Sequence, residues 1–286
     1  MIKILVTGAA GRIGGPICQH LQASGFEVRA VDRAPNLSLP VRVEVVNLLD
    51  REACYRVIEG LDAVVHLANH SSYQSAQLPQ TVFNENVAMN MNVFQAACDR
   101  GVKRILFSSS VQAFTVRHGP TPPELLPGPS FPYLPLDGKI PARSSNPYGL
   151  SKQVSEDMLR YFVSVYGVTA VAIRFPYVID EETLRRIRER KGGHRFSAEE
   201  AFAYLYIEDA ARLVEACLKA DLKGYHPYFP AAQDVQVAAD LPALLARHFN
   251  GTPWREGAPQ NVLIDISDIT RETGWRPSVN SLFPGA

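Results

Sequence analysis

Tyr148 and Lys152 are the two residues whose types and spacing best suit acid–base chemistry in this 286-residue sequence. They stand four positions apart in the segment NPYGLSK, which is expected to open a helix, so both side chains should share one helical face. A free tyrosine has a pKa of about 10 and is a poor base at neutral pH. An ammonium about 4 Å away, at an effective dielectric near 20, contributes about 4 kcal/mol, enough to bring that pKa to about 7. The alternative is an incidental pair on an exposed helix.

A run of three serines ends the fifth predicted strand, in the segment Phe107-Ser108-Ser109-Ser110. Ligands of open α/β sheets bind at the carboxyl edge of the strands. A hydroxyl there can hold the reacting oxygen of a carbonyl or alcohol and stabilise developing charge. We predict this role for Ser110, whereas Ser109 is expected to satisfy backbone groups.

The segment that follows the first strand, TGAAGRIGG, contains Gly8, Gly11 and Gly14. Glycine permits the tight turn, the approach of backbone to a pyrophosphate, and the close packing of the following helix on the sheet. The start of that helix offers unpaired N–H groups and a positive dipole end to phosphates. The pattern predicts a dinucleotide site.

Asp32 ends the second predicted strand, where a carboxylate can accept hydrogen bonds from an adenosine ribose. Such a carboxylate repels a 2′-phosphate and therefore favours NAD over NADP. Arg12 and Arg33 instead favour NADP, since either can pair with the 2′-phosphate. NAD is the expected cofactor, with NADP as the alternative, and Asp32 as a plain solvated strand end is a third interpretation.

Short apolar runs alternate with amphipathic stretches through the first 175 residues, which predicts an α/β fold with a doubly wound parallel sheet of the Rossmann type. The predicted strands are Ile2–Val6, Glu27–Val31, Arg42–Val46, Ala63–Leu67, Arg104–Phe107 and Ala170–Arg174. A long helix is expected over Pro79–Arg100, where apolar residues recur at three- and four-residue spacing.

The chain is expected to have two parts. Residues 1–175 would form the NAD-binding domain, and residues 176–286 a small, mostly C-terminal α/β substrate-binding part with some segments returning to the sheet. The second part should contain helices over Ile207–Ala220 and Leu241–Phe249. Residues 115–147 hold nine of the 21 prolines, so they are read as a long loop, either a wall of the active site or disordered.

These motifs together resemble an extended short-chain dehydrogenase/reductase of the NAD-dependent epimerase/dehydratase family. The matching pieces span nearly the whole chain: TGAAGRIGG, Asp32, DAVVHLA, Asn86 in NENV, FSSS, NPYGLSK, IRFPYV, YIEDAAR and TGWRP. The resemblance implies that Ser110, Tyr148 and Lys152 form the catalytic triad, and that Lys152 also holds the nicotinamide ribose.

The motifs and the resemblance also give the binding residues. The cofactor-binding set is Gly8, Ala10, Gly11, Arg12, Ile13, Gly14, Asp32, Arg33, Asn47, Leu48, Leu67, Ala68, Asn69, Asn86, Ser108, Tyr148, Lys152 and Pro176. Within it, Asn47 and Leu48 are expected near adenine, and Asn86 and Ser108 beneath the cofactor. The substrate-binding set is His70, Ser71, Ser110 and Arg174, although loop polarity also explains the first two.

Departures from the family bear on the reaction. Dehydratases place an Asp-Glu pair after the catalytic hydroxyl, whereas Val111-Gln112 stand here and cannot transfer protons. Epimerases of nucleotide sugars usually carry an asparagine shortly after the arginine of the sixth strand, whereas Phe175-Pro176-Tyr177 follow Arg174, and the C-terminal part is short. A basic cluster within residues 185–195 is either an anion clamp or the solvated face of an amphipathic helix.

The leading hypothesis is an NAD-dependent oxidoreductase that transfers hydride between NAD and a hydroxyl carbon of a small carbohydrate-like substrate, like a sugar or uronate dehydrogenase. The alternative is a nucleotide-sugar epimerase like UDP-glucose 4-epimerase, which returns the hydride to the opposite face. A third, non-catalytic hypothesis is a dinucleotide-sensing regulator, which the Tyr/Lys pair argues against.

Composition excludes several other classes. The chain has 29 basic and 29 acidic side chains and a pI near 7.1, so no net field draws it to nucleic acid. No apolar run approaches the ~20 residues of a membrane span. Four single cysteines suggest neither disulfides nor a metal site, so we expect a cytoplasmic protein. The resemblance implies a homodimer packed through the Pro79–Arg100 helix and the helix that carries Tyr148.

Overall fold

The computed structural model describes residues 1–36, 38–70, 78–115, 131–190, 198–235 and 240–278. Its main sheet has seven strands in the order β3-β2-β1-β4-β5-β6-β9, and every neighbouring pair is parallel. The strands are β1 (Lys3–Thr7), β2 (Glu27–Asp32), β3 (Val43–Val45), β4 (Ala63–His66), β5 (Arg104–Ser110), β6 (Thr169–Phe175) and β9 (Tyr225–Tyr228). The predicted doubly wound parallel sheet is confirmed.

Alternate residues of the strands enter two separate cores, one on each face of the sheet. In β1, Ile4 and Val6 pack into one core and Leu5 into the other. Because side chains alternate along a strand, a sheet covered on both faces needs strands that are apolar throughout. The continuous apolar runs in the sequence therefore reflect burial on both sides.

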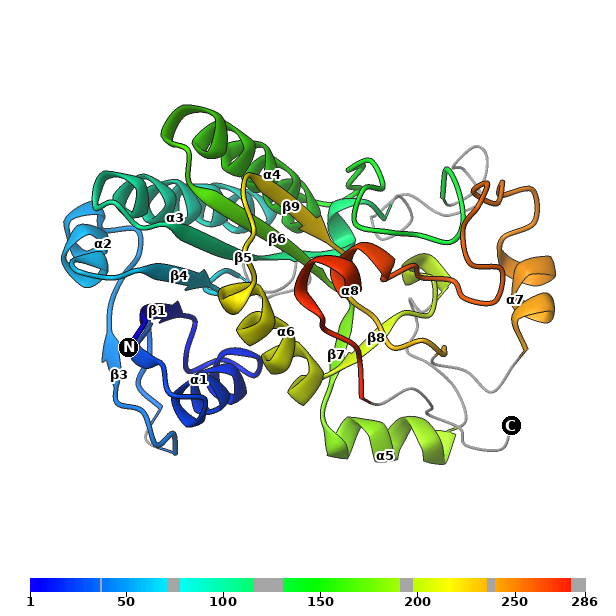
Figure 1. Ribbon diagram of the computed structural model, residues 1–286, viewed down its shortest axis with the longest axis horizontal. Coiled ribbons are helices and arrows are strands. Elements are labelled where there is room, and N and C mark those ends of the chain that lie inside the picture. The colour runs from blue at the N-terminus through cyan, green and yellow to red at the C-terminus, as the bar shows by residue number, and fades with distance from the viewer. Residues whose placement is uncertain (37, 71–77, 116–130, 191–197, 236–239, 279–286) are drawn as a thin grey trace.

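Helices cover both faces (Figure 1). The helices α1 (Gly14–Ala23) and α6 (Ile207–Lys219) pack against one face, and α2 (Arg51–Ile58), α3 (Pro79–Asp99) and α4 (Pro147–Tyr166) against the other. The strand order reverses between β1 and β4, because the chain first winds outward to β3 and then returns. Ligands of such folds bind at this switch point, beyond the carboxyl ends of the strands.

The start of α4 is fixed by its own sequence. Asn146 caps the helix, because its side-chain oxygen accepts a hydrogen bond from the backbone nitrogen of Gly149 at 2.8 Å. Pro147 occupies the first helical position, where its missing N–H costs nothing. This start places Tyr148 in the first turn and Lys152 one turn later.

The second part of the chain is less regular. It contains β7 (Tyr177–Ile179) and β8 (Tyr204–Tyr206), which pair in parallel, and the helices α5 (Glu181–Arg190), α7 (Leu241–His248) and α8 (Ser267–Thr273). The later half of the proline-rich segment joins it, since Leu134 and Leu136 form bridges with Trp254 and Ile264. The earlier half, residues 116–130, lies outside the described residues. β9 returns to the main sheet beside β6, and the division at residue 175 remains a prediction.

No helix in the described ranges is long and apolar enough to cross a membrane.

Candidate active site

The turn between β1 and α1 depends on glycines that cannot accept a side chain. Gly8 has a φ of +69°, and a Cβ atom there would lie 2.7 Å from the backbone nitrogen of Ala68. A Cβ atom at Gly14 would lie 2.0 Å from the carbonyl oxygen of Gly8. Both obstacles are backbone atoms, so no side-chain rotation relieves them. The turn therefore runs close against the chain after β4 and leads directly into the N-terminus of α1.

A cavity of about 740 Å³ opens beside this turn, at the carboxyl ends of the central strands. It is lined by most of the predicted site residues: Gly8, Ala10, Gly11, Arg12, Ile13, Gly14, Asp32, Arg33, Asn47, Leu48, Leu67, Ala68, Asn69, His70, Ser108, Ser110, Tyr148, Lys152 and Pro176. Asn86 and Arg174 do not line it, and Ser71 lies outside the described residues.

The cavity also has lining residues that were not assigned to the site from the sequence. They are Ala34, Val46, Leu49, Glu85, Met89, Ser109, Val111, Gln112, Phe175, Tyr177, Val178 and Glu200. Most are chain neighbours of predicted residues, and their positions follow once the strand ends are known. Glu200 is different, because it comes from the second part of the chain and carries no motif.

Ser110 and Tyr148 meet in this cavity. Ser110 is the last residue of β5 and Tyr148 the second residue of α4, and their side chains share a hydrogen bond. The backbone nitrogen of Gln112 also donates to Ser110 Oγ at 3.2 Å. Both side chains are nearly buried, so an oxygen held between them would be shielded from water.

The pKa of Tyr148 differs from the sequence prediction. Burial raises it to about 12, although the hydrogen bond with Ser110 acts in the opposite direction. The expected lowering by Lys152 is absent because the Lys152 ammonium is engaged elsewhere and stands 5.5 Å from the centre of the Tyr148 ring. Burial lowers the pKa of Lys152 itself to about 7. The helical spacing of the pair was predicted correctly, but the direction of the tyrosine pKa shift was wrong.

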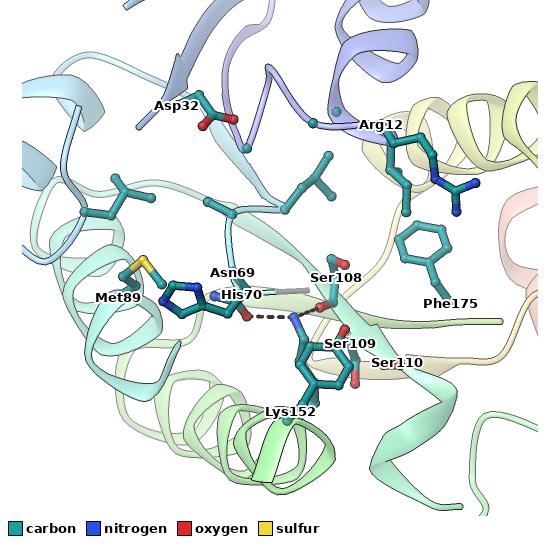
Figure 2. Close-up of a pocket in the computed structure, with 18 of the residues that line it drawn as sticks. Arg12, Asp32, Asn69, His70, Met89, Ser108, Ser109, Ser110, Lys152 and Phe175 are labelled. Carbon is teal, nitrogen blue, oxygen red and sulfur yellow. Dashed lines mark hydrogen bonds between the residues drawn. The ribbon is translucent and has the colours of Figure 1, made fainter. Parts of the chain in front are cut away.

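Two oxygens hold the Lys152 ammonium. It donates to Asn69 Oδ1 and to the carbonyl oxygen of Ser108, each at 2.6 Å (Figure 2). Asn69 in turn donates from its amide to Asn90 Oδ1 at 2.8 Å. The end of β4, the end of β5 and helix α3 thus jointly fix the position of Lys152.

A fully buried histidine extends this network to the glycine turn. His66 accepts a hydrogen bond from the Thr7 hydroxyl at Nδ1, at 2.7 Å, and donates from Nε2 to Asn90 Oδ1, also at 2.7 Å. Burial lowers the pKa of His66 to about 3, so its ring is neutral and this arrangement of protons is the one that satisfies every partner. The network joins the last residue of β1 to the lysine of α4.

Comparison with known proteins identifies the family. The profile of the NAD dependent epimerase/dehydratase family matches residues 4–228. The chain belongs to this family. The predicted resemblance is thereby confirmed, and with it an enzyme of the extended short-chain dehydrogenase/reductase type that uses NAD.

Individual relatives are more distant. A uronate dehydrogenase from Pseudomonas syringae pv. tomato is 28% identical over 221 residues, which cover 76% of this chain and 69% of the relative. An NAD-dependent glucose-6-phosphate dehydrogenase from Haloferax volcanii is 28% identical over 227 residues, covering 76% of this chain and 80% of the relative. The crystal structure of Thermus thermophilus UDP-glucose 4-epimerase in complex with NAD has a TM-score of 0.68 at 22% identity and covers 98% of this chain and 96% of that chain, so the two folds agree.

The cavity of this family member fits NAD. The glycine turn brings backbone close to the cavity where any Cβ atom would collide, and α1 begins there. Asp32 lines the cavity at the end of β2 and accepts a hydrogen bond from the backbone nitrogen of Ala10 at 3.0 Å, so it also fixes the turn. Arg12 does not stand beside Asp32. It donates to the carbonyl oxygen of Val178 at 2.7 Å, and its guanidinium lies over the Tyr177 ring, 6.0 Å from the ring centre. Figure 2 shows Arg12 and Asp32 apart, so only Arg33 is left of the two arginines expected to favour NADP.

His70 lines the cavity in a fixed orientation. Its Nε2 is paired with Glu85 Oε2 at 2.6 Å, and its backbone nitrogen donates to Asn86 Oδ1 at 2.7 Å. Asn86 is fully buried and also donates to Ser151 Oγ at 3.1 Å. Asn86 was expected beneath the cofactor, whereas the structure places it behind His70, where it supports the chain after β4.

Arg174 was predicted to bind substrate, and the structure does not support that role. Its guanidinium is buried and forms a bidentate pair with Glu156 of α4, at 2.9 and 2.7 Å. It also donates to the carbonyl oxygens of Gly138 and Ile140. Ser109, expected to satisfy backbone groups, instead donates to Glu156 Oε1 at 2.6 Å. Arg174 thus joins β6, α4 and the loop before α4.

The described part of the basic cluster is the solvated face of a helix. Helix α5 buries Leu184 and Ile187 and exposes its charged residues from Glu181 to Glu189, with Arg186 paired to Glu182. None of the residues of α5 lines the cavity. The side chain of Arg190 and the remaining members of the cluster, Lys191, His194 and Arg195, lie outside what the structure describes.

Proposed function

We propose that this protein is an NAD-dependent dehydrogenase that oxidises a hydroxyl carbon of a small carbohydrate-like molecule. The observation that carries the proposal is the hydrogen-bonded pair of Ser110 and Tyr148, which faces the same cavity as the glycine turn and Lys152. The names of two relatives, a uronate dehydrogenase and a glucose-6-phosphate dehydrogenase, support the reaction type.

The chemistry follows from the protonation of these groups. NAD, when bound, would supply the acceptor for the hydride that leaves the hydroxyl carbon. Ser110 holds the substrate oxygen, and Tyr148 exchanges the proton with it. Because burial raises the pKa of Tyr148 to about 12, the phenol is protonated at neutral pH, the form that donates a proton to a carbonyl during reduction.

Oxidation requires the opposite state of Tyr148. The phenol must lose its proton before it can accept one from the substrate, and a nearby cation favours that loss. Lys152 supplies this cation if its ammonium turns from Asn69 and Ser108 toward the phenol. We therefore assign Lys152, as long as it carries its proton, the role of stabilising ionised Tyr148.

The proposal is tested by the absorbance of NADH. Purified protein is mixed with NAD and a panel of aldoses, uronates and nucleotide sugars. We expect NADH to form in proportion to one class of substrate, and Tyr148→Phe to lower kcat by about 10²- to 10⁴-fold while NAD still binds. Tyr55→Phe is the matched control, since Tyr55 lies on α2 and does not line the cavity.

An epimerase gives a different result in the same assay. The proposal fails if a nucleotide sugar is isomerised without accumulation of NADH. It also fails if no member of the panel yields NADH, which would return the protein to the non-catalytic class.

We further propose a homodimer that packs through α3 and α4. These helices lie side by side on one face of the molecule (Figure 1). They expose large apolar side chains there: Met91 on α3, and Leu150, Tyr161, Val165 and Tyr166 on α4. Light scattering after size exclusion should give twice the chain mass of 31.6 kDa, and Val165→Glu should shift the protein to the monomer.

The proposed location is the cytoplasm. All four cysteines are free thiols, as is usual in a reducing compartment. An export-competent, disulfide-bonded form recovered from cells would contradict this.

A further inference from the structure

Asn69 is the side chain that holds the Lys152 ammonium in place. Its Oδ1 accepts a hydrogen bond from Lys152 Nζ at 2.6 Å, and the second acceptor, the carbonyl oxygen of Ser108, belongs to the backbone (Figure 2). Lys152 is fully buried, and Asn69 lines the cavity beside it. A carboxamide presents an oxygen on one side and an NH₂ group on the other, so it holds an ammonium in one orientation only.

The orientation of Asn69 is determined by a chain of hydrogen bonds that begins at the backbone. The backbone nitrogens of Leu67 and Ala68 donate to Thr7 Oγ1 at 3.1 and 3.2 Å. These bonds use both acceptor positions of the hydroxyl, so its proton goes to Nδ1 of His66, 2.7 Å away. Burial lowers the pKa of His66 to about 3 and keeps the ring neutral. The single proton of the imidazole therefore lies on Nε2.

Asn90 transmits this polarity to Asn69. Because Nε2 of His66 is a donor, Asn90 turns its Oδ1 toward it, at 2.7 Å, and its Nδ2 donates to Ser155 Oγ at 2.6 Å. The same Oδ1 accepts from Nδ2 of Asn69 at 2.8 Å, which leaves the oxygen of Asn69 for Lys152. His66 and Asn90 are fully buried, so bulk water does not compete for these bonds. The oxygen of Asn69 is therefore directed at the ammonium before any ligand binds.

Titratable groups surround Lys152, but none in the described part of the chain hydrogen-bonds to its ammonium. Tyr148 and Glu156 lie one turn away on α4, and His66 acts on it from β4. Burial is the larger cause that lowers the pKa of Lys152 to about 7, and the charge of Glu156, which pairs with Arg174 of β6, opposes it. The other titratable side chains of the cavity wall are Arg12, Asp32, Arg33, His70, Glu85 and Glu200. A neutral amide therefore holds this ammonium.

We propose that Asn69 is a positioning residue of the active site: it keeps the Lys152 ammonium at the ends of β4 and β5 and sets how readily that ammonium turns toward Tyr148. A neutral acceptor binds a cation less strongly than a carboxylate does, so the ammonium can leave Asn69 when the phenol ionises. The catalytic part of this inference rests on the proposed dehydrogenase function, whereas the placement of Lys152 does not.

The first experiment measures the ionisation of Lys152 without any substrate. The protein is labelled with ¹³C at the ε carbon of lysine, and the NMR signal that is missing from Lys152→Met is followed against pH. In Asn69→Asp the midpoint should rise by about one pH unit or more, because a carboxylate stabilises the charged form of the lysine. In Asn69→Ala the midpoint should fall by about one pH unit, because the ammonium loses an acceptor.

Shifts in opposite directions distinguish positioning from a purely structural role, which would move the midpoint in neither variant. Asn250→Ala is the matched control, since Asn250 is exposed and does not line the cavity, and its midpoint should equal that of the wild type. Circular dichroism checks the folding of each variant. A wild-type midpoint in folded Asn69→Asp would overturn the inference. If that variant does not fold, a wild-type midpoint in Asn69→Ala would overturn it instead.

The second experiment examines the dehydrogenase reaction. With the best substrate of the panel, Asn69→Asp should lower kcat for oxidation by about tenfold or more and leave KM near the wild-type value, because the carboxylate keeps the ammonium away from the phenol. An unchanged kcat in this variant, with a raised Lys152 midpoint, would show that Asn69 has no role in catalysis. Failure of the wild-type protein to form NADH with any sugar would overturn the proposed function, and the NMR titration would still decide what holds Lys152.

Discussion

The cofactor end of the cavity is built from neighbouring residues, whereas its catalytic end collects residues from distant elements. Gly8, Gly14 and the start of α1 lie within one strand–turn–helix unit, and backbone contacts alone decide their geometry. Ser110, Tyr148 and Glu200 come from β5, α4 and the segment before β8. Local sterics therefore fix the first end, and tertiary packing and buried polar pairs fix the second.

The difference explains why the two ends are recognisable to different degrees. A turn that needs glycine at fixed offsets leaves a pattern in the sequence. A charge that reaches the cavity from the second part of the chain leaves none, because any residue type can occupy the loop and only the fold tells where it lies. Four mutational tests, from the largest expected effect to the smallest, examine this contrast.

Of the four substitutions, removal of Glu156 should lower the free energy of unfolding most. In Glu156→Ala the buried guanidinium of Arg174 loses its bidentate partner, and leaving such a charge uncompensated costs about 3–5 kcal/mol. The free energy of unfolding, measured with urea, should fall by that amount. A loss below ~1 kcal/mol would mean that the pair does not hold β6 and α4 together.

Gly14→Ala tests the local end. The added Cβ atom meets the carbonyl oxygen of Gly8 at 2.0 Å, so the turn must shift, at a cost of about 1–3 kcal/mol of stability and with weaker NAD binding. Gly15→Ala is the control, since its Cβ atom would press only on the flexible Leu39 side chain at 3.1 Å and would stand 3.6 Å from the nearest backbone atom, the carbonyl oxygen of Ala9. Calorimetric titration should show weaker NAD binding for Gly14→Ala than for Gly15→Ala. Equal affinities in both would refute the steric account of the turn.

His66 connects the two ends and makes stability depend on pH. Burial lowers its pKa to about 3 in the folded protein, against about 6.5 in the unfolded chain, so below pH 6.5 the unfolded state binds more protons. The stabilisation that depends on a neutral, buried His66 is complete above pH 6.5 and is lost as the pH falls. Between pH 6.5 and 5 it should remove up to about 2 kcal/mol of unfolding free energy.

The pH dependence can be assigned to His66 by substitution. His66→Asn should be less stable at neutral pH and should show a shallower loss between pH 6.5 and 5 than the wild type. The partly exposed His248, which lies outside the network, serves as the control in His248→Asn. If His66→Asn lost as much unfolding free energy between pH 6.5 and 5 as the wild type, a group other than His66 would be the one that titrates.

Loss of an ion pair of α5 should change the free energy of unfolding least. Arg186 and Glu182 are both more than half exposed, so Arg186→Ala should change the unfolding free energy by about 0.2–1 kcal/mol at most. Activity should stay at the wild-type level, because α5 does not line the cavity. A marked loss of substrate affinity in this variant would revive the anion-clamp interpretation of the basic cluster.

Much of the first half could be predicted because its signals are periodic. Predicted strands such as Glu27–Val31 and Ala63–Leu67 differ from the observed β2 and β4 by a single residue at one end. The long helix predicted over Pro79–Arg100 is observed over Pro79–Asp99. Burial on both faces of a parallel sheet makes its strands uniformly apolar, and such runs are visible without any knowledge of their neighbours.

The wrong predictions concern side chains for which more than one interaction partner was possible. Arg174 was assigned to substrate because it ends a strand at the ligand edge, but Glu156 lies opposite it in space. Tyr148 was expected to have a lowered pKa because Lys152 is one turn away, but Asn69 and Ser108 hold that ammonium. In both cases the competing partner stands far away in the sequence.

The sequence by itself determined the class of fold, the glycine turn, the serine at the end of β5 and the Tyr/Lys helix, since each rests on short-range periodicity or local sterics. Only the tertiary structure decided how these groups are protonated and which charges face the substrate. The physical reason is that pKa values and ion pairs depend on burial and on nearby charges, and both are set by elements that meet only after folding.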